Sequence, residues 1–362
     1  MRDESRDREK NHMRTDESVE RPLHGLRVIE FEGIGPGPLA GRMLSDLGAH
    51  VIVVARPTTS AIDRTLIGNN TENPMRQGKE IIVLDLKTAN GVVAAPDLVA
   101  DADALIEGNR PGVMERLGLG PVECAIRNPR LVYGRMTGWG QSGPLAQAAG
   151  HDLNYIALTG LLSLSTRSGI APIVPPTVLG DAAGAMGLCF GLVSAVLDAR
   201  SSGRGRMVDA AITDVVAMLG TLVQAVRANG QIDGTQPSPF YDSPFYDAYA
   251  CADGRFITIC ALEPQFYALL LKKLQLDDVD PAAQYDRNQW CGLKTRLSQL
   301  FATYPSDHWC RLLEGSDVCF GPVLSIEEAV DHPHNKARGL YEKAVSRLVR
   351  TRGAPRFLPL PA

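Results

Sequence analysis

Short apolar runs separated by glycine-containing loops dominate the first part of the chain. Several of them are short enough to be buried strands, at residues 26–31, 51–55, 80–84, 104–106, 131–136 and 207–211. Stretches with helical spacing of apolar residues lie between or after them, at 39–47, 91–100, 122–128, 182–199 and 213–228. Because strands and helices alternate, the pattern predicts an α/β fold with a parallel sheet.

The pattern changes after residue 230. Residues 230–247 are rich in Gly, Pro, Asp and Ser, as in a linker, and Asp253-Gly254 then separates two apolar runs, which predicts a β-hairpin. Helical spacing follows at 265–274 and 293–303, and the tail is strand-like. We therefore predict these parts: a disordered extension at 1–22, a large Rossmann-like domain at 23–225, a linker at 226–245, a smaller α+β domain at 246–325, and a segment at 326–362 that returns to the large domain.

Composition excludes several classes of protein. The 362 residues carry a net charge of −4, from 37 basic and 41 acidic residues, so the strongly basic character of a nucleic-acid-binding or membrane-surface protein is absent. Residues 1–22 are charged and contain no apolar signal segment. The apolar run 182–197 is interrupted by glycines and is better interpreted as a buried helix than as a membrane span. The seven cysteines form no CxxC motif, which favours reduced thiols in a cytoplasmic protein and no metal site.

A segment rich in glycine and proline follows the first strand, at Gly33–Pro38. It lacks the G-x-G-x-x-G spacing of a dinucleotide-binding loop, because Pro38 stands where the last glycine belongs. The second strand ends at Arg56 instead of the acid that binds a ribose. A cation there suits a phosphate-bearing ligand, although Arg56 taken alone is more simply a solvated surface residue. A dehydrogenase is therefore disfavoured.

Three residues at predicted helix starts are candidates for acid–base chemistry. His151 lies next to Asp152 between a Gly/Pro-rich loop and an apolar stretch at 153–162, where free helix amides can receive developing negative charge. It is a candidate general base. Asp181 opens the helix at 182–199 and is as well explained by an N-cap as by catalysis. Glu263 also precedes a helix, and for it the sequence alone favours a cap.

Eight segments in one order resemble the α-methylacyl-CoA racemase branch of the family III CoA-transferase superfamily. They are Gly33–Pro38, Leu84–Lys87, Arg110–Gly120, Gly138–Pro144, Gly150–Tyr155, Gly180-Asp181, Glu263–Tyr267 and Asp331–Gly339. The chain departs from the family pattern at Thr177, where Asn is frequent, at Glu32, where a small residue is common, and in its N-terminal extension.

The resemblance implies a racemase or epimerase that inverts the α-carbon of 2-methylacyl-CoA thioesters, in fatty acid and lipid metabolism, by 1,1-proton transfer through an enolate. His151 and Asp181 would face opposite sides of that carbon, because a single base returns the proton to the face it left. Glu263 would orient His151, and the Asp152 amide would bind the thioester oxygen. One such preorganised donor is typically worth about 3 kcal/mol.

The resemblance also implies a ligand site and an assembly. The coenzyme A portion of the substrate would contact Arg56, Leu84, Asp85, Leu86, Lys87, Arg110, Gly150, Leu153, Asn154 and Tyr155. No separate cofactor would be needed. The family fold is a Rossmann-like large domain plus a smaller one, in a homodimer whose chains interlock so that His151 and Glu263 meet across the subunit boundary.

Two alternatives remain open at this stage. In a family III CoA-transferase the aspartate at position 181 is a nucleophile that forms mixed anhydrides, but these enzymes generally lack the histidine at position 151. A catalytically silent acyl-CoA-binding protein is the second alternative, and the intact set of His151, Asp181 and Glu263 disfavours it. Branched fatty acyl, sterol side-chain and aryl-propionyl thioesters all remain possible substrates.

Overall fold

The computed structural model describes residues 21–58, 73–88, 96–166, 170–232, 236–342, 349–358 and 360. The chain divides into two compact units. The first unit runs to Leu219 and resumes at Arg352, and the second spans Gly220–Thr351. The predicted domain boundaries lay at 225 and 326. The prediction for the N-terminal extension falls almost entirely outside the described residues, as does that for the helical residues 91–95.

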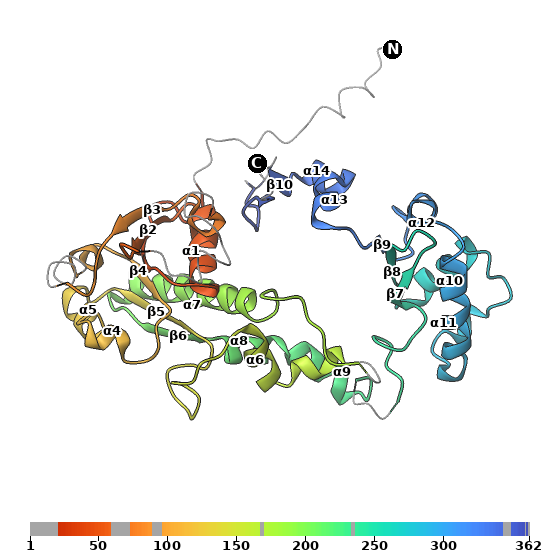
Figure 1. Cartoon of the computed structure of the whole chain (residues 1–362), viewed down its shortest axis with the longest axis horizontal. Coiled ribbons are helices and arrows are strands. Elements are labelled where there is room, and N and C mark those ends of the chain that lie inside the picture. The colour runs from red at the N-terminus through yellow and green to blue at the C-terminus, as the bar shows by residue number, and fades with distance from the viewer. Residues whose placement is uncertain are drawn as a thin grey trace, which may run out of the picture. The chain divides into compact units, whose positions relative to one another are not determined.

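A parallel sheet of six strands forms the centre of the first unit, in the order β3-β2-β1-β4-β5-β6 (Figure 1). The strands are β1 (Arg27–Phe31), β2 (His50–Ala55), β3 (Glu80–Val83), β4 (Ala104–Glu107), β5 (Val132–Thr137) and β6 (Met207–Ala211). This is the strand order of doubly wound folds, in which the order reverses between β1 and β4 and ligands bind beyond the carboxyl ends of the strands. The α/β prediction is confirmed.

Helices cover both faces of this sheet (Figure 1). Helices α1 (Pro36–Asp46) and α7 (Asp181–Ser202) pack on one face, where strand residues such as Val28 and Ile106 meet them. Helices α4 (Val113–Arg116) and α5 (Pro121–Arg127), with helical residues 96–100, cover the other face, where Ile29 points. Burial on both sides explains why the strands are continuous apolar runs.

Helix α7 is the only described helix long and apolar enough to cross a membrane, and 44% of its apolar window is buried. Its glycines permit close packing: a Cβ added at Gly184 would lie 2.8 Å from Ile212, and one at Gly187 would lie 2.4 Å from Val215. These contacts support its interpretation as a core helix.

Several predicted element bounds are corrected. Pro36–Pro38 form the first turn of α1 instead of a loop, since proline is tolerated there. The helix predicted at 153–162 is α6 (Asp152–Leu158), which ends early because Gly160 adopts a left-handed conformation with φ 82° before the 3₁₀ helix η3 (Leu161–Ser165). The helix predicted at 213–228 is divided at Gly220 into α8 (Ile212–Leu219) and α9 (Thr221–Ala228).

The second unit has its own sheet and core. Strands β7 (Tyr246–Ala250), β8 (Phe256–Cys260) and β9 (Phe320–Pro322) pair antiparallel, which confirms the predicted hairpin. Phe245, Trp290 and Phe301 are among the residues that fill its core. The other elements of this unit are α10 (Pro264–Lys273), η4 (Pro281–Ala283), α11 (Arg287–Phe301), α12 (Ser306–Leu313), α13 (Ile326–Asp331), α14 (Pro333–Arg338), β10 (Tyr341–Glu342) and β11 (Arg350–Thr351). The first unit also contains the 3₁₀ helix η2 (Pro74–Arg76).

Candidate active site

The sequence-predicted ligand residues of the first unit follow the carboxyl ends of parallel strands. Gly33–Gly35 follow β1, Arg56 follows β2, Leu84–Lys87 follow β3 and Arg110 follows β4. Because parallel strands end at the same edge of a sheet, these segments share one edge. The fold therefore provides the surface at which a ligand of a doubly wound sheet binds.

His151 lies at the start of α6, as predicted, and is its N-cap residue. Its backbone N–H donates to Asn154 Oδ1 at 3.1 Å, and its carbonyl accepts from the Asn154 N–H at 2.8 Å. The imidazole is exposed. Asn154, predicted as a ligand residue, thus fixes the backbone that carries the candidate base.

The approach to α6 is packed against an aromatic pair. The Tyr155 hydroxyl donates to the Gly150 carbonyl, and the Tyr155 ring meets the edge of Trp139 with ring centroids 4.7 Å apart. Cβ atoms added at Gly138 or Gly150 would overlap these rings, at 1.9 Å from Tyr155 and 2.8 Å from Trp139. The glycines of both motifs therefore serve close packing next to His151.

Asp181 is the first residue of α7, and Gly180, not Asp181, is the N-cap. The backbone N–H groups of Gly180 and Asp181 both donate to Asp152 Oδ1, at 2.8 and 2.7 Å. Asp152 itself is buried, with 8% of its surface exposed. The beginning of α6 is thus bonded directly to the beginning of α7, which places His151 and Asp181 in the same part of the molecule.

The glycine loop after β1 touches the Asp181 carboxylate. A Cβ added at Gly35 would lie 3.0 Å from Asp181 Oδ2, and Gly35 has φ 69°, so both space and backbone favour glycine. Burial and, after it, the charge of the neighbouring Asp152 raise the pKa of Asp181 to about 6, while His151 opposes the rise. A carboxyl group with this pKa exchanges protons close to neutral pH, as general acid–base catalysis requires.

Tyr155 lies within electrostatic range of both Asp181 and Arg110. Burial raises the pKa of Tyr155, the charge of Asp181 adds to that rise, and the charge of Arg110 opposes it. Leu153, in the same helix, is 52% exposed. The structure therefore brings together His151, Asp152, Tyr155, Asp181 and Arg110.

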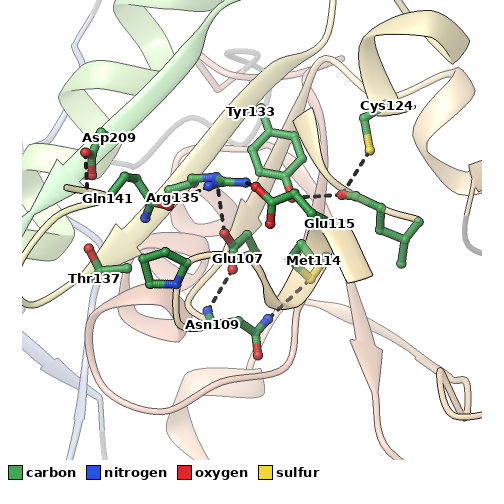
Figure 2. A network of polar contacts seen from close by, with 12 residues as sticks. Glu107, Asn109, Met114, Glu115, Cys124, Tyr133, Arg135, Thr137, Gln141 and Asp209 are labelled. Carbon is green, nitrogen blue, oxygen red and sulfur yellow. Dashed lines mark hydrogen bonds and ion pairs between the residues drawn. The ribbon is translucent and has the colours of Figure 1, made fainter. Parts of the chain in front are cut away.

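A buried polar network supports the segment that carries Arg110 (Figure 2). Glu107 is 2% exposed, and its carboxylate accepts the backbone N–H of Asn109 at 2.7 Å. Arg135 lies 3.6 Å from Glu107 and bonds also to Glu115 and Gln141, so that β4, β5 and α4 are tied together. Burial raises the pKa of Glu107 to about 7. Nothing in the sequence pattern pointed to this network.

Arg56 is paired with Glu32, a residue where the chain departs from its family pattern. The Arg56 backbone N–H donates to Glu32 Oε2 at 2.9 Å, and its guanidinium donates to the Glu32 carbonyl at 3.2 Å. Glu32 also forms an ion pair with Arg76. Glu32, Gly35 and Arg76 line one cavity. Arg76, which the sequence analysis did not single out, is therefore a second cation beside this predicted phosphate site.

The last two sets of predicted residues are placed as follows. The Leu84 N–H donates to the Ala55 carbonyl at 2.9 Å and extends the β3–β2 pairing, and the Lys87 N–H donates to Asp85 Oδ1 at 3.0 Å in the turn that follows.

Glu263 belongs to the second unit, where it is the exposed N-cap of α10. Its charge contributes to the raised pKa values of Tyr285 and Cys319, which identifies these residues as its neighbours.

The first unit is a doubly wound α/β domain. An aspartate, a histidine and arginines lie at the carboxyl edge of its sheet, where proteins of this class bind their ligands. The sequence profile of CoA-transferase family III matches residues 23–358, and the chain belongs to this family. It is 38% identical to the alpha-methylacyl-CoA racemases of Mus musculus and Homo sapiens, over 94% of this chain and 87% of each relative.

A relative with a different named activity is also similar. The probable fatty acyl-CoA transferase Rv3272 of Mycobacterium tuberculosis is 30% identical over 86% of this chain and 85% of that protein. Its crystal structure matches with a TM-score of 0.76 and 29% identity, covering 93% of both chains. The similarity to racemases and to a transferase together suggests an enzyme that acts on acyl-CoA.

Proposed function

We propose that this protein is a racemase or epimerase of 2-methylacyl-CoA thioesters. The observation that carries the proposal is the bond between the starts of α6 and α7, which holds His151 and Asp181 at one edge of the sheet. The similarity to racemases and the pKa of about 6 at Asp181 support it. A carboxyl group with this pKa is present in both protonation states slightly below neutral pH, so it can serve as base for one epimer and as acid for the other.

In the proposed reaction one of the two groups removes the α-proton, the C–H electron pair forms the C=C bond of the enolate, and the carbonyl π pair moves onto the thioester oxygen. The resulting enolate receives a proton on its opposite face from the other group. The Asp152 N–H is the first in α6, where amides have no partner within the helix, and it is the proposed donor to the enolate oxygen. The thioester carbonyl takes up the negative charge, so no further cofactor is needed.

The coenzyme A portion is proposed to lie along the carboxyl edge of the sheet. Arg56 and Arg110 would hold phosphate groups through their forked donors, and Leu84–Lys87 would line the nucleotide.

Incubation of one epimer in deuterated water tests the reaction. We expect deuterium at the α-carbon and loss of optical purity with no added carboxylic acid. His151→Ala should slow exchange of one epimer more than the other, and Asp181→Asn should show the opposite bias. Equal exchange by both variants with either epimer would contradict the assigned roles.

A family III CoA-transferase is the second candidate, favoured by the similarity to the Mycobacterium tuberculosis protein. In that case Asp181 would attack the thioester carbonyl and form a mixed anhydride with release of the coenzyme A thiolate. Product formation would then require an added carboxylate, and exchange without one would not occur.

We further propose a homodimer in which Glu263 of one chain orients His151 of the other. Support comes from an apolar stripe on α7, where Met186, Phe190 and Leu197 are 62%, 77% and 73% exposed, since such a surface is typical of an interface. Mixing a His151→Ala chain with a Glu263→Gln chain tests this arrangement. A mixed dimer would contain one doubly altered site and one intact site, so activity should partly return. No recovery in a verified mixed dimer would exclude sites shared between chains.

A further inference from the structure

We propose that the Asp152 carboxylate is a positioning residue that fastens the first turn of α7 and thereby holds Asp181 in its working place. The inference rests on the proposed function for the role of Asp181. It differs from the donor role of the Asp152 backbone amide, because it concerns the side chain.

The geometry of this clamp is specific. One buried oxygen, Asp152 Oδ1, accepts two consecutive backbone N–H groups at 2.8 and 2.7 Å across 28 and 29 residues of sequence. Both N–H groups belong to the start of a helix, where the helix itself supplies no acceptor. Bonds between a carboxylate and backbone amides are stronger than neutral ones. The clamp therefore fixes the backbone of the residue whose carboxylate is the proposed acid–base group.

Gly180 shows how closely the two chain segments approach. A Cβ added there would lie 2.4 Å from Asp152 Oδ1 and 2.9 Å from its Cγ, far inside normal contact. Because the space above the carboxylate is occupied by the Gly180 backbone, Asp152 has one available arrangement. A glycine at this position is thus a requirement of the clamp.

The clamp also brings a negative charge close to Asp181. The charged and titratable groups that act on Asp181 or interact with it are His151, Asp152 and Tyr155 at the start of α6, and the N-cap of α1, Gly35, approaches the Asp181 carboxylate. Arg110 acts on Tyr155 as well. After burial, the Asp152 charge is the larger contribution to the raised pKa of Asp181. An ionised Asp152 therefore favours the protonated form of Asp181.

Two substitutions separate position from charge. Asp152→Asn keeps an acceptor oxygen and removes the charge, whereas Asp152→Ala removes both. Asp209→Asn is the matched control, since Asp209 Oδ2 accepts the Gln141 N–H at 3.0 Å and makes no contact with Asp181. The carboxyl group of Asp181 is titrated directly in the full chain by isotope-edited infrared difference spectroscopy, with Asp181→Asn identifying its signal.

We expect Asp152→Asn to move the Asp181 midpoint to lower pH by about half a unit or more, with kcat at high pH changed only a few-fold. Asp152→Ala should lower kcat at least about tenfold more than Asp152→Asn, with KM little affected. Asp209→Asn should leave the midpoint where it is. Full kcat in a folded Asp152→Ala protein would overturn the inference. If the unaltered protein exchanges no α-proton, the proposed function fails. An Asp181 midpoint that is the same in Asp152→Ala as in Asp152→Asn would then still overturn the clamp, because the two variants differ in the acceptor and not in charge.

Discussion

Replacement of Gly180 by alanine tests the junction of α6 and α7 without altering a polar side chain. Gly180 has φ −91° and ψ −70°, a conformation open to alanine. At an N-cap, glycine is preferred over alanine, so the helix offers no stabilisation to Gly180→Ala. The structure adds a steric reason against alanine, because the new methyl group would lie 2.4 Å from Asp152 Oδ1.

The magnitude follows from the two bonds that must lengthen. Moving the carboxylate to normal contact weakens both of its hydrogen bonds to backbone amides, and hydrogen bonds to charged groups contribute about 1.5–3 kcal/mol each. Partial loss of the pair costs about 3 kcal/mol, and no helix propensity offsets it because Gly180 is the N-cap. We expect a destabilisation of about 3 kcal/mol, which lowers the melting temperature by about 6–12 °C in a unit of this size.

Thermal unfolding and α-proton exchange provide the assay, and Gly292→Ala provides the control. Gly292 lies inside α11, and a Cβ added there meets nothing within 4 Å, so that variant should gain up to about 1 kcal/mol. Gly180→Ala should unfold at lower temperature and lose exchange for the epimer that Asp181 deprotonates. A Gly180→Ala protein as stable and as active as the unaltered chain would refute the reasoning.

Three other predictions follow from charged groups in the first unit. Since burial raises the pKa of Asp181 to about 6, kcat/KM for the epimer it deprotonates should fall about tenfold per pH unit below 6, as a pH–rate profile would reveal. The free energy of unfolding should change with pH in the opposite direction to kcat/KM. The stability that protonated Asp181 contributes to the fold is present at low pH and is lost as the pH rises through about 6. Glu30→Leu should cost about 3–5 kcal/mol in denaturant unfolding because it leaves Lys79 buried without its partner, and the double variant with Lys79→Met should recover most of that loss. Glu32→Gln should remove the negative charge 4.0 Å from the Arg56 guanidinium and lower KM for acyl-CoA several-fold at low salt, and a difference that persists at high salt would argue against an electrostatic cause.

The sheet was predictable because its strands are buried on both faces. Residues Val51–Ala55 and Ala104–Ile106 are buried on both faces of the sheet. Each strand is therefore a continuous apolar run, which can be recognised in the sequence. Helix ends were less predictable: α11 begins at Arg287, six residues before the predicted start, because the Asp286 side chain caps it while the exposed first turn shows little apolar spacing.

The site was predictable only in part. His151, Asp181 and Glu263 stand at helix starts, as their neighbours in sequence indicated. The carboxylate bond from Asp152 to residues nearly thirty positions away could not be foreseen, because it depends on how two helices pack. The only sequence signal was a glycine directly before a helix that begins with aspartate.

The order of the strands along the chain has a consequence for biosynthesis. The sheet of the first unit is complete at Ala211, before any residue of the second unit has been made, and only the segment from Arg352 arrives later. A nascent chain on the ribosome can therefore assemble its largest hydrophobic core early. The second unit, with its separate core, is made next, and the segment from Arg352 completes the first unit last.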